Sequence, residues 1–212
     1  CSLNPCPRNP TMPKTVCLAL TGASGMPYGL RLLECLLAAD CKVQLLYSQA
    51  AQIVARQEMD IELPSRPAEA KNALLSHFAA VNPEKLAVFG REEWFAPVAS
   101  GSNPPDAMVI CPCSMGTLAA IAQGLADNLI ERAADVVIKE GRKLVLVPRE
   151  TPFSAIHLEN MLRLSRAGAI ILPPNPGFYH HPQNVQDIVD FVVARAMDQL
   201  GVPHMLMQRW GE

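Results

Sequence analysis

The sequence predicts an α/β fold with a doubly wound parallel sheet. Short apolar segments alternate with amphipathic segments through the chain, as strands and helices do in such folds. Several of the short segments are apolar throughout, which is typical of parallel strands covered by helices on both faces. Loops rich in Gly, Ser and Pro follow the expected strands, at the edge where these folds bind ligands.

The first half of the chain carries three strand candidates, over residues 16–21, 42–47 and 87–89. Between the first two, Tyr28, Leu32, Cys35 and Leu36 recur at helical spacing and predict an amphipathic helix. A second helix follows the second strand and ends near Glu58.

In the second half we expect strands over residues 107–111, 144–148 and 169–172. Apolar stripes at helical spacing predict the helices between and after them. These helices span residues 128–140, 154–167 and 185–200.

Length and composition describe one globular domain. The chain has 212 residues, of which 50% are hydrophobic and 18% charged, so it can bury a core and a ligand pocket. With 18 Lys and Arg against 20 Asp and Glu, its charge balance predicts no nucleic-acid partner and no anionic membrane surface. No apolar run approaches the ~18 residues of a membrane span, so we expect a cytoplasmic location.

The first thirteen residues differ from the rest. Residues 1–13 contain four prolines and no periodicity. We interpret them as a disordered leader or as a segment of expression-vector origin. The single domain is then expected to span residues 14–212.

Seven cysteines, an odd number, are scattered and lie mostly in apolar stretches, which indicates reduced core residues and not a disulfide framework. Cys111 and Cys113 are the one close pair, but no second pair or suitably spaced histidine completes a zinc site. We therefore expect no metal. The remaining cysteines are Cys1, Cys6, Cys17, Cys35 and Cys41.

Two strand-end loops have the composition of anion sites. Residues 21–25 open a helix and can present backbone N–H groups and a hydroxyl to an anion. Their G-x-x-G spacing lacks the second glycine of the dinucleotide fingerprint, so a mononucleotide phosphate fits better than NAD. A purely steric role for the glycines is an equal alternative. Residues 114–117 repeat the pattern, and a plain helix N-cap explains them as well.

The charged candidates differ in position. Arg132 and Lys139 lie seven residues apart on one helical face, and Arg195 lies in the last helix. Each of these taken singly reads as a solvated surface base. Arg149 is different because it directly follows a strand at the ligand edge. Glu150 beside it is either a salt-bridge partner or an acid/base group, and Glu58 reads by default as a solvated helix-end carboxylate.

The remaining ring side chains give weaker signals. Trp94 and Trp210 stand alone in loop or tail segments, where we expect them to cover a core or an oligomer contact. His157, His180 and His181 have no Ser or Cys triad context. We expect His180 and His181 to be solvent-exposed loop residues.

Five motifs in register resemble the UbiX/Pad1 family of flavin prenyltransferases, over residues 14–212. Each motif is modest by itself, and the five together in this order are specific. They are TGASG at 21–25 followed by Tyr28-Gly29, PCS at 112–114 with Thr117, ERAAD at 131–135, PRETP at 148–152 and PGFYH at 176–180.

The resemblance implies a three-layer Rossmann-like (flavodoxin-like) fold and a homododecamer that binds FMN between subunits. The family transfers a dimethylallyl group from dimethylallyl phosphate to N5 and C6 of reduced FMN. The prenylated FMN is then the cofactor of a UbiD-type decarboxylase, in ubiquinone biosynthesis or aromatic acid decarboxylation.

The resemblance also assigns residues. Ser24, Glu58, Lys139 and Glu150 would be catalytic, with Ser24 and Glu58 moving protons near the flavin. One departure is Gly141, where the family pattern Lys-Glu-Arg-Arg-Pro has arginine. The FMN site would comprise Gly22, Ala23, Ser24, Ser48, Ser114, Met115, Gly116, Thr117 and Arg149, and the dimethylallyl phosphate site Arg132, Lys139, Glu150, Tyr179 and Arg195.

The residues support metal-independent transfer at one point. The chain has no D-D-x-x-D motif to hold magnesium on a diphosphate, so basic side chains would have to stabilise a departing phosphate. Two alternatives stay open. One is a flavin-dependent cysteine decarboxylase of the same superfamily, disfavoured because residues 112–117 lack its asparagine. The other is a non-catalytic flavin carrier, which would need no site for a leaving phosphate.

Overall fold

A computed structural model describes residues 15–78, 81–207 and 211 of the chain. It contains a six-stranded parallel sheet with the strand order β3-β2-β1-β4-β5-β6. The predicted doubly wound α/β fold is confirmed, and each of the six predicted strands is present. They are β1 (Thr15–Leu20), β2 (Lys42–Tyr47), β3 (Leu86–Val88), β4 (Ala107–Cys113), β5 (Lys143–Pro148) and β6 (Ile170–Ile171).

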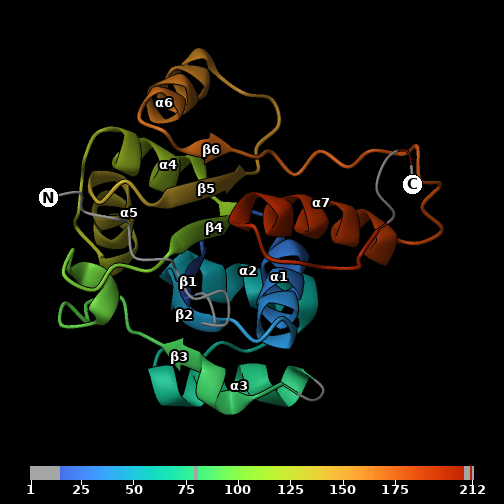
Figure 1. Ribbon diagram of the computed structural model, residues 1–212, viewed down its shortest axis with the longest axis horizontal. Helices are drawn as coiled ribbons and strands as arrows, with labels where there is room; N and C mark the ends of the chain where they lie inside the picture. Colours follow the sequence, from blue (N-terminus) through green and yellow to red (C-terminus); the bar gives the residue numbers. More distant parts are fainter. Residues whose placement is uncertain (1–14, 79–80, 208–210, 212) are drawn as a thin grey trace, which may run out of the picture.

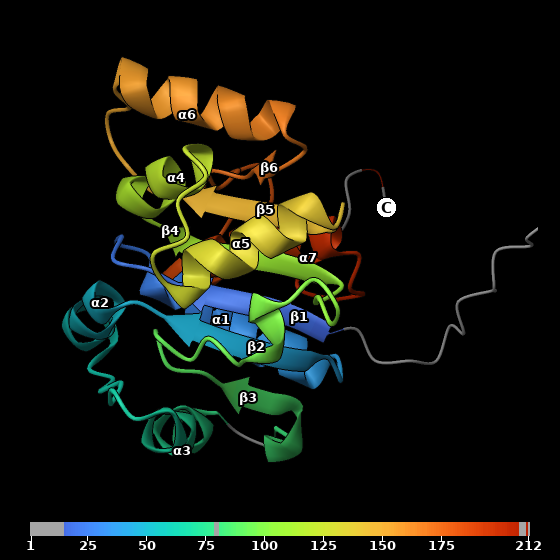
Figure 2. The ribbon, with the colours of Figure 1, turned by 90° about the vertical axis from the view of Figure 1, so that its left-hand side faces the viewer.

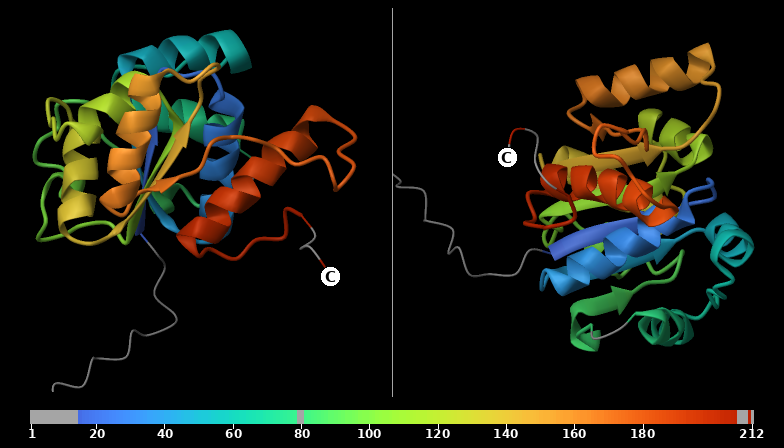
Figure 3. Two further views of the ribbon diagram at one scale, coloured as in Figure 1. Left: turned by 90° about the horizontal axis from the view of Figure 1, so that it is seen from above. Right: turned by 90° about the vertical axis from the view of Figure 1, so that its right-hand side faces the viewer.

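Helices cover both faces of the sheet and make three layers (Figure 1; Figure 3, left). On one face α1 packs against both α2 and α7, and on the other α4 packs against both α5 and α6. The helices are α1 (Met26–Ala38), α2 (Gln49–Met59), α3 (Pro67–His77), α4 (Met115–Ala122), α5 (Leu129–Lys139), α6 (Ala155–Arg166) and α7 (Val185–Leu200), with 3-10 turns η1 (Pro83–Lys85) and η2 (Pro97–Ala99).

The apolar strands separate two cores. In β1, Val16, Leu18 and Leu20 face the core beneath α1 and α7, whereas Cys17 and Ala19 face the core beneath α4 and α5. All five side chains are at most 1% exposed, which explains why the segment is apolar at every position and not at alternate ones.

An irregularity in β4 places the two cysteines of the close pair on different faces of the sheet. The pairing of β4 with β5 shifts register between Ile110 and Cys113, around Pro112, which has no N–H to donate. Residues two apart in a strand normally share a face, but Cys111 belongs to the α1/α7 core and Cys113 to the α4/α5 core. The two thiols therefore lie on opposite faces and do not form a metal-binding pair.

The five cysteines within the described ranges are buried and no disulfide joins any two of them, as predicted for reduced core residues. Burial raises the pKa of the thiols of Cys17, Cys111 and Cys113 well above the ordinary value, so they are poor nucleophiles. Cys1 and Cys6, with the rest of the predicted leader, lie outside the described residues.

The differences from the predicted elements are small. Helix α3 has no counterpart in the predicted set, because its apolar stripe is weak and only Ala70 and Leu74 are buried. Strand β4 runs two residues beyond its predicted end, to Cys113. None of the helices in the described part of the chain is long and apolar enough to cross a membrane.

The carboxyl ends of the strands meet at one edge of the sheet, beside α2 and the start of α4 (Figure 2). The chain turns in opposite directions from β1 and β4, to β2 on one side and β5 on the other. Ligands bind at such a switch point in doubly wound folds. The strand order therefore predicts a ligand site at the carboxyl ends of β1 and β4.

Candidate functional site at the carboxyl edge of the sheet

Thr21 joins the two strands at the switch point. Its hydroxyl donates to the carbonyl oxygen of Pro112 at 2.8 Å and accepts from the Ser114 N–H at 2.7 Å, while its own N–H donates to Pro112 at 3.2 Å. The side chain is fully buried. Thr21 therefore sets the position of Ser114, the residue that begins α4.

A carboxylate of the protein itself occupies the N-terminus of α1. Glu58, in the last turn of α2, accepts hydrogen bonds from the Gly25 N–H at 2.9 Å and the Met26 N–H at 2.8 Å. The sequence predicted that this loop presents N–H groups to an anion, and in the structure that anion is Glu58. The interpretation of Glu58 as a merely solvated carboxylate is wrong: it is exposed, but its oxygens are engaged by another element.

The electrostatics of Glu58 depend on its neighbours. Partial burial acts to raise its pKa, but hydrogen bonds from the Ser24 side chain and from the Gly25 and Met26 N–H groups, together with the charge of Arg149, lower the pKa overall. Arg149 Nε also donates to the Ser24 carbonyl oxygen at 3.2 Å. The tips of β1, α2 and β5 thus converge on a Ser24–Glu58–Arg149 cluster. Ser24 and Glu58 are predicted catalytic residues, and Ser24 and Arg149 are predicted FMN residues.

Three helix N-termini surround a pocket on the β2 side of the edge. The pocket holds about 290 Å³ and is lined by Ser48, Gln49, Ala50, Arg91, Thr117, Asn128 and Ile130. Ser48 caps α2, Ser114 caps α4 and Asn128 caps α5, each through a side-chain oxygen. The positive ends of three helix dipoles and the Arg91 guanidinium make it suited to a phosphate. We call it the three-helix pocket.

Glycine stands at two positions of this edge for different structural reasons. A Cβ at Gly22 would collide with the Cβ of Ala50, so close packing of the β1 loop on α2 accounts for Gly22. A Cβ at Gly116 would meet no atom within 4 Å, and Gly116 is exposed at the start of α4. Open space beside a helix start, with no packing reason for glycine, fits a position that a bound group approaches closely.

On the β5 side, a second pocket of about 260 Å³ runs along the strand-end loops. Arg149 and Glu150 line it together with Pro148, Thr151, Pro152, Phe153, Pro174 and Asn175. Arg149 directly follows β5 at the carboxyl edge of the sheet, the position that the sequence predicted. Prolines from two loops form part of the wall, so the pocket has a stiff rim.

Helix α5 begins at this edge and carries Lys139, its last residue, away from it. Arg132 donates to the Ala99 carbonyl oxygen at 3.0 Å and pairs with Asp135 at 2.8 Å. Lys139 ends α5 and pairs with Glu140 at 2.6 Å, beside Gly101 in the loop before β4. Because α5 runs antiparallel to the strands, Lys139 lies at the amino edge of the sheet, opposite Arg149.

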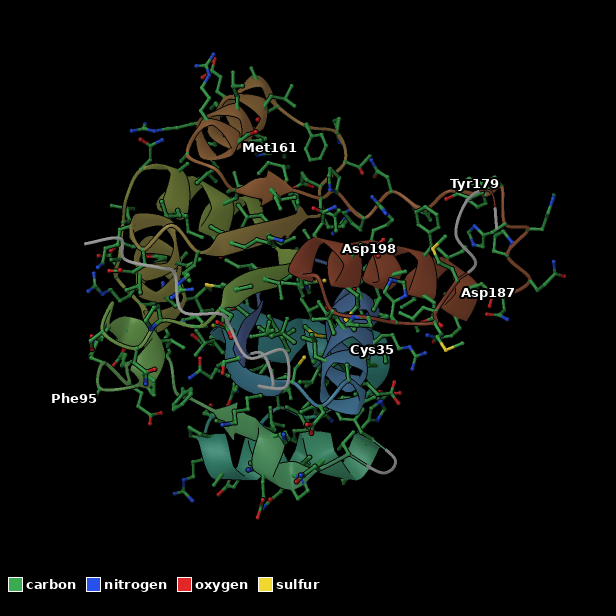
Figure 4. All side chains as sticks on the ribbon, in the orientation of Figure 1. Cys35, Phe95, Met161, Tyr179, Asp187 and Asp198 are labelled. Atoms are coloured by element: carbon green, nitrogen blue, oxygen red, sulfur yellow. The ribbon has the colours of Figure 1, made fainter. Side chains whose placement is uncertain are left out.

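Tyr179 and Arg195 lie in a third place, on the segment after β6 and on α7. Tyr179 makes an edge contact with Phe191, with ring centroids 5.9 Å apart, and Arg195 follows Phe191 by one helical turn. Figure 4 shows Tyr179 and Asp198 on the α7 side of the molecule, with Phe95 on the opposite side. The chain by itself does not bring the predicted donor residues together.

His180 corrects a prediction. His181 is exposed as expected, but the His180 ring stacks on Phe191 with centroids 5.2 Å apart and an interplanar angle of 14°. Both ring nitrogens are buried. The loop position suggested exposure, whereas the packing of the segment on α7 covers the ring.

Sequence reasoning missed Thr21, Arg91 and Asn128. Arg91 follows β3 by three residues, so the strand-end rule that selected Arg149 would also have selected it. Asn128 precedes an apolar stripe and has the N-cap signature. Trp94 is about half-exposed near the pocket-lining loop, which leaves its predicted role open, and Trp210 lies outside the described residues.

Comparison with known proteins identifies the family. The Flavoprotein family model matches residues 7–197. A flavin prenyltransferase UbiX from Pseudomonas aeruginosa is 58% identical over 200 residues, which cover 94% of this chain and 95% of the relative. The chain belongs to the UbiX family of flavin prenyltransferases.

Solved structures of UbiX proteins share the fold over nearly the whole chain. AnUbiX in complex with FMN and dimethylallyl pyrophosphate has a TM-score of 0.84 at 37% identity, covering 95% of this chain and 99% of that one. A dodecameric FMN-dependent UbiX-like decarboxylase from Escherichia coli has a TM-score of 0.82 at 42% identity, covering 93% of this chain and 100% of that one. The predicted resemblance is confirmed, and so is the flavodoxin-like fold that it implied.

The cysteine decarboxylases are more distant. A PPC decarboxylase structure is 18% identical with a TM-score of 0.54, a likeness that extends to the fold alone. Membership of the UbiX family therefore favours the prenyltransferase over the decarboxylase alternative.

Proposed function

We propose that this protein transfers a dimethylallyl group from dimethylallyl phosphate to N5 and C6 of reduced FMN, releasing phosphate. Its identity to a UbiX flavin prenyltransferase supports the activity. The observation that carries the proposal in the structure is the Ser24–Glu58–Arg149 cluster beside the pocket that Arg149 lines, because it combines a hydroxyl, an ionised carboxylate that can accept a proton and a cation at the switch point.

The FMN phosphate would bind in the three-helix pocket. Helix N-termini and Arg91 supply positive potential there, and the space beside Gly116 allows close approach. Gly25 and Met26 donate to Glu58, so the β1 loop would contact the flavin through Gly22, Ala23 and Ser24 and not as the phosphate cradle. Ser48, Met115 and Thr117 would complete the site.

The flavin supplies the nucleophilic atoms when it is bound at this edge. Glu58 is ionised at neutral pH, since its pKa is lowered, and it can accept a proton that Ser24 relays. Arg149 offsets the carboxylate charge beside it. Glu150, in the adjoining pocket, would contact the donor phosphate or its leaving oxygen.

The donor phosphate needs residues from more than one copy of the chain. Glu150 lies at the carboxyl edge, Lys139 at the amino edge, and Tyr179 and Arg195 on α7. An assembly in which neighbouring chains present α5 and α7 to the edge of another would bring these groups together, and a UbiX-like relative is dodecameric. We therefore propose a homododecamer with sites between subunits.

A transfer assay tests the function. Protein mixed with reduced FMN and dimethylallyl phosphate, without Mg²⁺, should yield a flavin heavier by one C5H8 unit on mass spectrometry, together with one phosphate. Bound FMN of unchanged mass would support the carrier alternative. Running the assay with dimethylallyl diphosphate in parallel determines the donor.

The product would serve a UbiD-type decarboxylase, in ubiquinone biosynthesis or aromatic acid decarboxylation. Adding the reaction product to such an apo-decarboxylase should restore its activity. We propose a cytoplasmic location for this step. Fractionation of the source cells tests that location.

A further inference from the structure

We propose that Asp198 and His204 are positioning residues that hold Arg195 in place for the phosphate of the prenyl donor. The inference rests on the proposed function, in which Arg195 binds that phosphate. It assigns a role to a series of side-chain contacts that connects α7 to the segment following it.

The carboxylate of Asp198 is shared between two partners. Its Oδ2 accepts from Arg195 Nη1 at 2.7 Å, and its Oδ1 lies 3.1 Å from His204 Nε2. The two contacts use different oxygens of the carboxylate, so they can exist at the same time. The carboxylate thus joins the guanidinium on α7 to a residue of the C-terminal segment.

The hydrogen bonds of His204 define which nitrogen carries the proton. Its Nδ1 accepts from the Leu206 N–H at 3.3 Å, so the neutral ring has its proton on Nε2 and donates it to Asp198. The His204 side chain is only 8% exposed, compared with 48% for Arg195. A covered imidazole on one side therefore supports an accessible guanidinium on the other.

Neither the helix dipole nor the C-cap accounts for an acid at this place. Asp198 lies in the last turn of α7, where a negative charge faces the negative end of the helix dipole. The helix already has a C-cap at Gly201, whose N–H donates to the backbone of the last turn. The contact with Arg195 gives a reason for an acid at this position, and it is the contact that the positioning role requires.

The orientation leaves donors for a ligand. Asp198 is the one hydrogen-bond partner seen for the Arg195 guanidinium within the described part of the chain. A guanidinium held at Nη1 keeps its other N–H groups for a phosphate. Tyr179, which contacts Phe191 one turn earlier, lies on the same side of α7. Fixing Arg195 therefore fixes its geometry relative to Tyr179.

The test compares Asp198→Asn, His204→Ala and His204→Gln with wild type at saturating reduced FMN. We expect KM for dimethylallyl phosphate to rise at least fivefold in Asp198→Asn and at least threefold in His204→Ala, with kcat within twofold and FMN affinity unchanged. In His204→Gln the side-chain amide can still donate to Asp198, so KM should stay within twofold of wild type.

A matched control is Glu69→Gln, which removes the acid of another i,i+3 pair with arginine, Arg66–Glu69 at 3.0 Å at the exposed start of α3. It should change neither KM nor kcat. Unchanged KM in Asp198→Asn and His204→Ala, with an active wild type, overturns the positioning role alone. Calorimetric titration with dimethylallyl phosphate separates the remaining case: a wild type that neither transfers nor binds it overturns both proposals, and equal affinity of wild type and Asp198→Asn overturns this one.

Discussion

The Glu58 carboxylate in the last turn of α2 lies 2.8 Å from the backbone nitrogen of Met26 and caps the first turn of α1. One side chain thereby accepts hydrogen bonds from N–H groups that have no partner within α1, and it brings an ionised group to the switch point. Helix α1 has no cap from its own N-cap residue, Gly25, so the contact with Glu58 replaces a local one.

Substitution Glu58→Gln should destabilise the protein modestly and abolish prenyl transfer. The charge interaction with the α1 N-terminus contributes about 0.5–1 kcal/mol, a range that already allows for solvent screening of an exposed group. Urea denaturation measures the loss. Glu62→Gln, at a highly exposed acid 3.8 Å from Arg56, is the control and should be neutral.

The stability difference between wild type and Glu58→Gln should depend on pH. The folded-state pKa of Glu58 is lowered from its ordinary value of 4.5, so its stabilisation is fully present above that pH and is lost as the pH falls through the folded pKa. The stability difference between wild type and Glu58→Gln should therefore shrink below about pH 4.5. A difference that grows on acidification contradicts the assignment.

Substitution Thr21→Val should cost about 1–3 kcal/mol, because it leaves the part-buried Ser114 N–H and the buried Pro112 oxygen without the hydroxyl. FMN affinity should fall as well, since Ser114 begins α4. Thermal unfolding and flavin titration measure the two effects. Ser76→Ala, which removes an exposed hydroxyl bonded within α3, should be neutral.

Two glycine substitutions should behave in opposite ways. Gly116→Ala meets no neighbour and should leave stability equal or raise it by about 0.5 kcal/mol, while weakening FMN binding at least about tenfold. Gly22→Ala should instead destabilise the fold, because its methyl group collides with Ala50. If Gly116→Ala binds FMN with the affinity of wild type, FMN does not approach the start of α4 closely at position 116.

Substitution Arg91→Met should discriminate between FMN and riboflavin. Removing a cation from the three-helix pocket should weaken FMN binding about tenfold and leave riboflavin binding unchanged, since riboflavin has no phosphate. Fluorescence titration gives both affinities. Arg66→Met, at the exposed N-cap of α3, is the control, and equal losses for both flavins would place the phosphate elsewhere.

Mixed assemblies should test the shared site. Lys139→Met and Glu150→Gln should each be inactive, because each removes a residue of the proposed donor site. Lys139 and Glu150 lie at opposite edges of the sheet, so a complete site would need two chains. In assemblies formed by co-expression with two tags, about one quarter of sites that span two chains would hold both native residues. Recovery of about that fraction of wild-type activity is expected, and no recovery would place both residues in one chain's site.

The sequence alone was enough to determine the order of the strands along the chain, the apolar composition of both cores and the strand-end position of Arg149. These properties are local: periodicity reports burial, and parallel strands place their carboxyl ends at one edge. The motifs in register were also enough to indicate the family.

Only the tertiary structure decided how distant residues meet. Glu58 caps α1 across 32 residues, Thr21 links β1 to β4 across 91–93 residues, and His180 is covered by packing on α7. It also separated Lys139 from Glu150, although they are close in sequence, because a helix antiparallel to its strands carries its end to the far edge. Periodicity shows which face a side chain takes, but the partner on that face depends on the packing of the whole chain.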